Sequence, residues 1–552
     1  MDRFEEDGMH ILGVADGLDA GAALVEDDRL VAVAHQARLD RTPRSRAFPW
    51  DAIDEVLRIG GISASEVDRI AVAGKFTPPL ALRRDPRLHR AVRNPFSPAL
   101  DAGVFYQAVL QQTGFGAMDA DRTAELLEQR FSERGFAPGR VVLVDIHAAL
   151  ANGAYRTQDH DPLTVFSLHP MGDGKAAAVY RGTAGQVDRI WEQRGFSSLH
   201  VHLQRCCAAI GLSWATEHQR LWALAARGKP SRELLKLLHE QLHAEGPRLS
   251  RRRYPWPARM QDRVYRALAD APAPDAAASV LTNLERAIVA WVAHHVAGTP
   301  GSVALVGAVF DNPRLVASVA ALEDVRGIWV PPEPGFGLLA VGAALYRAGA
   351  TGASLDAPLL LEPPADAIAA CLPRATPMDD ADLAAIMADA GVVGRYVGRR
   401  GLGSHGAGSR SVLARADRSS AVAAARAAVG RAGDEEPLLV LRSSALGTVG
   451  ETLAIAERHG VAAPALRTLA RKFPGAATAD GRVLLHVVRP GDDLDHLLAA
   501  LEAQTGCSGI AALPLGLGDS PPASTVAEAA RVWASSELDA LRVGDLGVRR
   551  LP

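Results

Sequence analysis

The stretch that decides the fold is "MHILGVADGLDAGAALVEDDRLVAVAHQA", residues 9–37. Three short apolar runs are separated by a glycine-containing turn and by the pair Asp27 and Asp28, a pattern typical of three antiparallel strands. The amphipathic segment 50–60 predicts a helix, and the apolar run "VDRIAVAG" (67–74) predicts a buried strand. The N-terminal region is therefore predicted to be a β-meander followed by a layered α/β arrangement.

The same pattern returns in "LTVFSLHPMGDGKAAAVYRGTAGQVDRIWEQ", residues 163–193. Strand, glycine loop and helix follow at 302–322, and strand, loop and helix at 327–349. This repetition predicts a duplicated α/β domain, which is the plan of the actin-like ATPase superfamily. Its paired glycine turns would face one another, and their peptide N–H groups suit phosphates.

A proline-rich, acidic stretch, "LDAPLLLEPPADAIAACLPRATPMDD" (355–380), predicts a boundary. We therefore expect a two-part domain over 1–355, a linker over 356–380 and a second α/β domain over 381–552. The last begins with a predicted helix at 381–390, a strand at 392–398 and a Gly/Arg loop at 399–410.

Composition restricts the classes of function. The 552 residues are 48% hydrophobic and 22% charged, and their net charge of −3 provides no field for nucleic acid. Four cysteines without a C-x-x-C pattern predict neither disulfides nor a zinc ribbon, as expected in the cytoplasm. The acidic start predicts no signal peptide, and the lack of about 18 consecutive apolar residues predicts no membrane span.

Several motifs, in order, resemble the O-carbamoyltransferases of antibiotic and nodulation-factor biosynthesis, including those acting on tobramycin-like and cephamycin-like substrates. They include "GLDAGAALVEDDRLVAVAHQARLDR" (17–41), "GDGKAAAVYRG" (172–182), "LVGAVFDNPRL" (305–315) and "GRRGLGSHGAGSRSVLAR" (398–415). The resemblance implies an actin-like N-terminal domain that transfers a carbamoyl group at an iron-type metal. It also implies a C-terminal YrdC-like domain that forms carbamoyl-adenylate from ATP and carbamoyl phosphate.

The chain departs from this family at the metal. The family motif "HHLAH", whose first and last histidines are ligands, is matched by "IHAAL", so that Ile146 and Leu150 occupy the ligand positions. The two aspartate ligands are matched by His169 and Phe336. Because all four positions are changed, three of them to hydrocarbon, we expect iron or another divalent metal to be absent.

Other polar residues remain candidates. His147, His169 and Asp145 are the candidate catalytic groups. Candidates for nucleotide contact are Asp19, Gly172, Asp173, Gly174, Gly307, Asn312 and Arg410. The glycines have an alternative explanation, since turns and helix packing require them whatever the chemistry.

Two further patterns are ambiguous. His200 and His202 alternate as on one face of a strand or turn, and with His169 and Asp173 they would form a different metal site; packed histidines are the alternative. Cys206 and Cys207 lie in an apolar segment and are expected in the core.

Three functional hypotheses follow. The chain is a metal-less pseudoenzyme of natural-product biosynthesis that pairs with an active paralogous carbamoyltransferase, with another pathway enzyme or with itself. Alternatively, it is an active ATP-dependent carbamoyl or acyl transferase with a non-standard site and a hydroxyl or amine acceptor. A nucleotide-sensing role is a third possibility. No nucleic-acid or membrane partner is expected.

Overall fold

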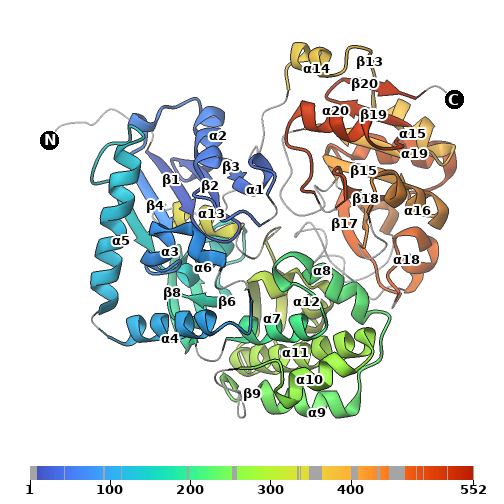
Figure 1. Ribbon diagram of the computed structural model, residues 1–552. Helices are drawn as coiled ribbons and strands as arrows, with labels where there is room; N and C mark the ends of the chain where they lie inside the picture. Colours follow the sequence, from blue (N-terminus) through green and yellow to red (C-terminus); the bar gives the residue numbers. More distant parts are fainter. Residues whose placement is uncertain are drawn as a thin grey trace.

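The computed structural model describes residues 9–42, 44–90, 94–113, 115–195, 198–250, 258–331, 333, 335, 337–346, 363–398, 408–431, 436–446, 467–479, 481–488, 490–518 and 520–550. Figure 1 shows a blue and teal N-terminal region, a green helical region and an orange and red C-terminal region. Phe336, Gly403, His405, the three arginines at 251–253 and the two at 399–400 lie outside the described residues.

The first half of the N-terminal domain is a five-stranded sheet in the order β3-β2-β1-β4-β5. The meander is β1 (His10–Ala15), β2 (Gly21–Glu26) and β3 (Arg29–His35), and Asp27 and Asp28 form its second turn with positive φ. Strands β4 (Arg69–Ala73) and β5 (Val141–Val144) extend the sheet in parallel with β1. Helix α2 (Trp50–Gly60) covers it, as predicted for 50–60.

The second half repeats this topology. Its strands lie in the order β8-β7-β6-β11-β12, with an antiparallel meander of β6 (Leu163–Gly172), β7 (Lys175–Thr183) and β8 (Gln186–Arg194). Strands β11 (Gly301–Val306) and β12 (Val325–Trp329) continue in parallel. The identical strand order confirms the predicted duplication of an α/β unit.

Two helices lie between the sheets. Helix α6 (Ile146–Arg156) leads from β5 into the second half, and α13 (Leu338–Leu345) packs against it. One hydrophobic core contains side chains of both helices and of both sheets. The helices approach so closely that a Cβ on Gly342 would lie 1.9 Å from the carbonyl oxygen of Ala149.

A helical layer covers the other face of the second sheet. Its helices are α7 (Leu199–Ala209), α8 (Trp214–Ala225), α9 (Arg232–Gln241), α10 (Arg263–Asp270), α11 (Ala273–Val296) and α12 (Pro313–Ala320). Cys206 and Cys207 are buried on α7, as predicted. Among the described residues α11 alone is long and apolar enough to span a membrane by length and composition, and most of its apolar window is buried in this core.

The C-terminal region is a separate eight-stranded mixed sheet in the order β13-β20-β19-β14-β15-β18-β16-β17. Its central strands are β14 (Val393–Tyr396), β15 (Arg410–Arg415) and β18 (Gly509–Pro514). Helices α15 (Asp380–Ala388) and α19 (Asp495–Thr505) cover one face, and α16 (Ser419–Ala428) and α20 (Val526–Ala534) cover the other. The predicted linker contains two elements of this unit, α14 (Ala365–Cys371) and β13 (Thr376–Pro377).

Arg41, which follows the first meander, joins the two regions. Its guanidinium donates to the carbonyl oxygens of Pro522 and Pro521 at 2.9 and 2.8 Å, and its Nε lies 3.4 Å from Glu528. Glu528 also caps α20, so this arginine holds the start of a C-terminal helix against the first half.

Gly342 tests how tightly α13 packs on α6. Gly342→Ala is expected to lower the free energy of unfolding by about 3 kcal/mol, because the new methyl group meets the rigid backbone at Ala149. The matched control is Gly103→Ala on α4 (Pro98–Gln112), where an added Cβ meets nothing within 4 Å and alanine is expected to stabilise the helix by about 1 kcal/mol. Calorimetric melting of both variants measures the difference; equal melting temperatures would contradict the described packing.

Candidate functional site

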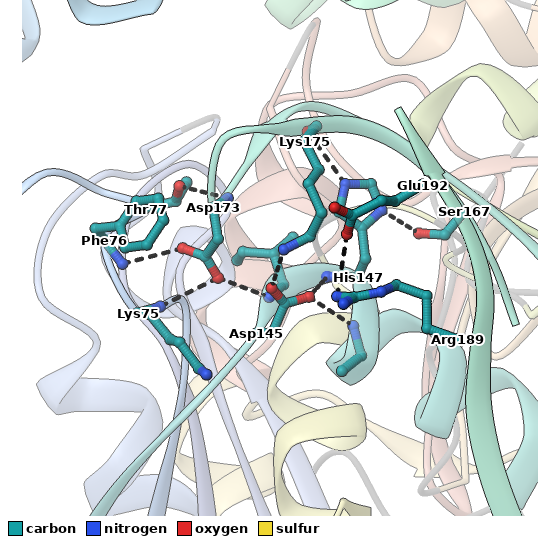
Figure 2. Close-up of polar contacts among 12 residues, drawn as sticks. Lys75, Phe76, Thr77, Asp145, His147, Ser167, Asp173, Lys175, Arg189 and Glu192 are labelled. Carbon is teal, nitrogen blue, oxygen red and sulfur yellow. Dashed lines mark hydrogen bonds and ion pairs between the residues drawn. The ribbon is translucent and has the colours of Figure 1, made fainter. Parts of the chain in front are cut away.

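The two halves meet at the N-terminus of α6. The turn between β6 and β7 places Asp173 there, buried and with a φ of 52°. Its carboxylate accepts N–H groups of Lys75 (3.2 Å) and Phe76 (3.0 Å) from the first half, and of Ile146 (2.9 Å) from α6. Asp173 therefore binds the loop after β4 to the start of α6 (Figure 2).

Asp145 is the N-cap of α6, a position that favours a side-chain acceptor. One of its oxygens accepts the N–H groups of His147 and Ala148, both at 3.1 Å. The other lies 2.5 Å from the ammonium group of Lys175, which comes from the first residue of β7. Both partners are largely buried, with side-chain exposures of 14% and 7%, so the pair is an interior salt bridge.

The two carboxylates have opposite electrostatic environments. Burial opposes the ionisation of Asp145, but the Lys175 ammonium prevails and holds the pKa of that carboxyl below its usual value. Burial and the neighbouring charge of Asp145 raise the pKa of Asp173, against the stabilising N–H groups. The start of α6 therefore holds two acidic groups beside the Lys175 ammonium group.

His147, a predicted catalytic candidate, is fully buried. Its Nε2 lies 3.1 Å from the carbonyl oxygen of Lys175, which can only accept, so Nε2 carries the proton. Nδ1 then accepts the hydroxyl of Ser167 at 2.8 Å. Burial lowers the pKa of His147 to about 4, and both ring nitrogens are engaged within the protein.

The other histidines lie nearby but on different elements. The ring of His169, on β6, is 6.2 Å from that of His147, and burial lowers its pKa. The predicted strand or turn at His200 and His202 is wrong: both lie on helix α7, because Ser198 caps its start. His202 lies 3.6 Å from Cys206, one turn along the same helix.

The first glycine turn, between β1 and β2, contains two more carboxylates. Asp16 forms a bidentate pair with Arg83 at 2.8 and 2.9 Å, and the arginine side chain is only 1% exposed. Asp19, a predicted nucleotide contact, has a φ of 53° and pairs with Arg44. Both carboxylates on this turn therefore form ion pairs with arginines of the same chain.

The residues at the family's metal positions do not fit a metal. Ile146 and Leu150 are 2% and 0% exposed and belong to the core shared by the two sheets. Alkyl side chains cannot coordinate a cation, and among the described residues no group of three or more His, Cys, Asp or Glu side chains converges on a possible ion position. His169 is the one potential ligand that the structure describes at these positions.

The residues that were predicted to contact phosphate have structural roles in the fold. A Cβ on Gly172 would lie 2.7 Å from the Ile146 side chain, Gly174 has a φ of 80°, and a Cβ on Gly307 would lie 2.1 Å from the carbonyl oxygen of Leu168. Asn312 caps α12 by accepting the N–H of Arg314 at 3.0 Å.

Arg410 has a similar role in the C-terminal region. Its guanidinium donates to the carbonyl oxygens of Val397 at 2.8 Å and Gly398 at 2.7 Å, and it stacks 3.7 Å from the ring centre of Tyr396. The arginine therefore holds its own loop in place.

Sequence reasoning missed Lys175, Arg83 and Asp311. Lys175 directly follows the "GDG" turn, a position at which a cation would face the carboxylates of that turn. Arg83 has no local signal, since 67 residues separate it from Asp16. Burial raises the pKa of Asp311 to about 7, with Glu333 and Asp19 adding to the effect of burial and Arg44 opposing it. This carboxyl is able to exchange a proton near neutral pH.

The family model described as the carbamoyltransferase N-terminus matches residues 10–345, which include both α/β halves. The chain therefore belongs to the carbamoyltransferase family. An uncharacterized protein of Synechocystis sp. is 25% identical over 230 residues, 40% of this chain. The match spans about a third of that relative, 35% of its length.

Solved structures are similar at a lower level. HypF of T. kodakarensis has a TM-score of 0.32 and 13% identity over 62% of this chain and 47% of its own. The activator of the 2-hydroxyisocaproyl-CoA dehydratase from Clostridium difficile, with bound ADPNP, has a TM-score of 0.31 and 12% identity over 62% of this chain and 94% of its own. Similarities at these scores carry no conclusion about activity.

Because His147 is buried, the stability of the folded chain is expected to decrease at acidic pH. The folded pKa of about 4 is below the ordinary value of 6.5, so the unfolded chain binds the extra proton. The stability that this histidine contributes is complete above about pH 6.5 and is lost as the pH falls toward 4, at about 1.4 kcal/mol per pH unit.

Urea unfolding of the wild type and of His147→Gln between pH 7 and 4 measures this slope. The slope of the free energy of unfolding against pH is expected to be smaller in the variant, by the amount that corresponds to the binding of about one proton. Identical slopes for wild type and His147→Gln would contradict the burial of a neutral imidazole.

Proposed function

We propose that this chain is a metal-less pseudoenzyme of the carbamoyltransferase family in natural-product biosynthesis. It would act by pairing with an active paralogous carbamoyltransferase or another enzyme of the pathway, or with a second copy of itself. We also infer that its C-terminal mixed sheet is the YrdC-like unit of the family. The mixed sheet with helices on both faces supports that assignment.

One observation carries the proposal: the carboxylates at the junction are neutralised by the chain itself. Asp16 pairs with Arg83, Asp19 with Arg44 and Asp145 with Lys175. Asp173 is held by three backbone N–H groups. A divalent metal or a magnesium nucleotide would compete with these contacts for the carboxylate oxygens.

The apolar side chains at the predicted ligand positions also disfavour a bound metal. A polar pocket that loses its ion leaves buried charges that cost several kcal/mol, whereas Ile146 and Leu150 fill the space with packed apolar volume. The substitutions and the internal ion pairs together describe a junction that is stable without a metal.

A specific observation favours the second candidate function, an active ATP-dependent carbamoyl or acyl transferase with a non-standard site. Asp311 follows the loop after β11, and its pKa of about 7 suits a group that accepts a proton from a hydroxyl or amine. His169 would be the nearby imidazole candidate at the junction. In this version ATP would bind between the glycine turns.

Metal content and turnover separate the two functions. Purified full-length protein is expected to contain no stoichiometric iron and to release no AMP or pyrophosphate from ATP when carbamoyl phosphate is supplied. A family member with an intact "HHLAH" motif, assayed in parallel, is the positive control. Turnover that depends on carbamoyl phosphate, and that Asp311→Asn abolishes, would reject the pseudoenzyme and support the alternative.

The proposed pairing of this chain with another protein or with a second copy has a separate test. Co-expression with intact carbamoyltransferase homologues encoded beside it is expected to yield a stable complex in size-exclusion chromatography with light scattering. Inactive monomeric protein, with no such complex and no self-association, would contradict the partnering role.

A further inference from the structure

We propose that Lys175 is the resident cation of the junction, its tethered ammonium group supplying the positive charge that a bound metal supplies in a catalytic member of the family. The inference rests on the proposed function, because it assumes that the wild-type junction works without a divalent ion. It assigns Lys175 a positioning role: the ammonium keeps two buried carboxylates together at the start of α6.

The first support is the placement of the ammonium. Lys175 Nζ lies 2.5 Å from Asp145 Oδ2, and Figure 2 shows the lysine side chain reaching from β7 onto that carboxylate. Asp145 and Asp173 accept N–H groups from consecutive residues of α6, since Ile146 donates to Asp173 and His147 donates to Asp145. The two negative groups are thus held side by side on one helix end.

The second support is the need for a cation. Each carboxylate is buried, and the charge of Asp145 raises the pKa of Asp173. The N–H groups and the helix dipole provide only partial positive charge, worth about 1 kcal/mol at a helix end. A full unit charge within hydrogen-bonding distance is what allows Asp145 to remain ionised in this interior.

The third support is the number of carboxylate oxygens that a cation could contact. Asp145 Oδ1 and both oxygens of Asp173 are occupied by N–H groups, which leaves Asp145 Oδ2 for a cation. A single free oxygen suits an ammonium group, whereas a magnesium or manganese ion bound there would need water for most of its about six ligands. The neighbouring Ile146 side chain adds none.

The consequence is specific. Removing the ammonium opens space beside two carboxylates, and these should then recruit a small divalent cation from solution. A lysine that merely filled volume would leave no such affinity. Cation binding by a lysine-free variant therefore distinguishes a charge-supplying role from simple packing.

The experiment uses the full chain and Mn²⁺ as the probe. Lys175→Met, close in volume but uncharged, is expected to lower the melting temperature by about 5 °C or more at pH 7. Millimolar Mn²⁺ should restore at least half of that loss, and electron paramagnetic resonance should detect one bound ion per chain. Wild type and Lys175→Arg should show neither change.

Arg205 provides the matched control. It forms a buried ion pair with Asp101 between α7 and α4, also at 2.5 Å and with both side chains under 8% exposed. Arg205→Met should also lower the melting temperature, but Mn²⁺ should not restore it, because Asp101 is the carboxylate that the structure describes in contact with this arginine. Equal rescue of both variants would overturn the proposal, as would a Lys175→Met protein that Mn²⁺ does not stabilise.

The double variant Asp145→Asn/Lys175→Met covers failure of the single variant to fold. Removing the unpaired charge should restore folding and abolish the Mn²⁺ response. A double variant as unstable as Lys175→Met would overturn the proposal. Carbamoyl-phosphate turnover by wild type, in contrast, would reject the proposed function without altering these melting shifts.

Discussion

The structure of the N-terminal domain depends on the salt bridge between Lys175 and Asp145 at the start of α6. This helix begins where the first sheet ends and lies between the two sheets, so its position sets how the halves meet. Asp145 caps the N-terminus of this helix, and Asp173 connects the same helix end to the loop after β4. The ion pair makes this charged arrangement tolerable in the interior, where an unpaired carboxylate would be expelled or protonated.

The same junction separates what the fold requires from what a metal would require. The backbone requirements of the fold are intact: Gly172 and Gly342 sit where any side chain would collide with α6. The side-chain requirements of a metal are not met at Ile146 and Leu150. Geometry is maintained by packing and turns, whereas coordination needs particular donor atoms, so the second can be lost while the first persists.

Arg41 links the C-terminal sheet to the N-terminal domain. Arg41 follows the same meander that carries Asp19, and it reaches both the carbonyl oxygens at Pro521 and Pro522 and the capping carboxylate Glu528.

The sequence alone determined the repeated meanders, the helix at 50–60, the burial of Cys206 and Cys207 and the family, since periodicity and ordered motifs are local signals. It also led to the prediction, which stays untested, that Ile146 and Leu150 occupy the family's ligand positions. Only the tertiary structure decided that Arg83 neutralises Asp16, that Lys175 neutralises Asp145, and that His200 and His202 lie on a helix. These outcomes depend on pairs from distant segments and on burial, which fix charge states through desolvation and partners that no short stretch of sequence contains.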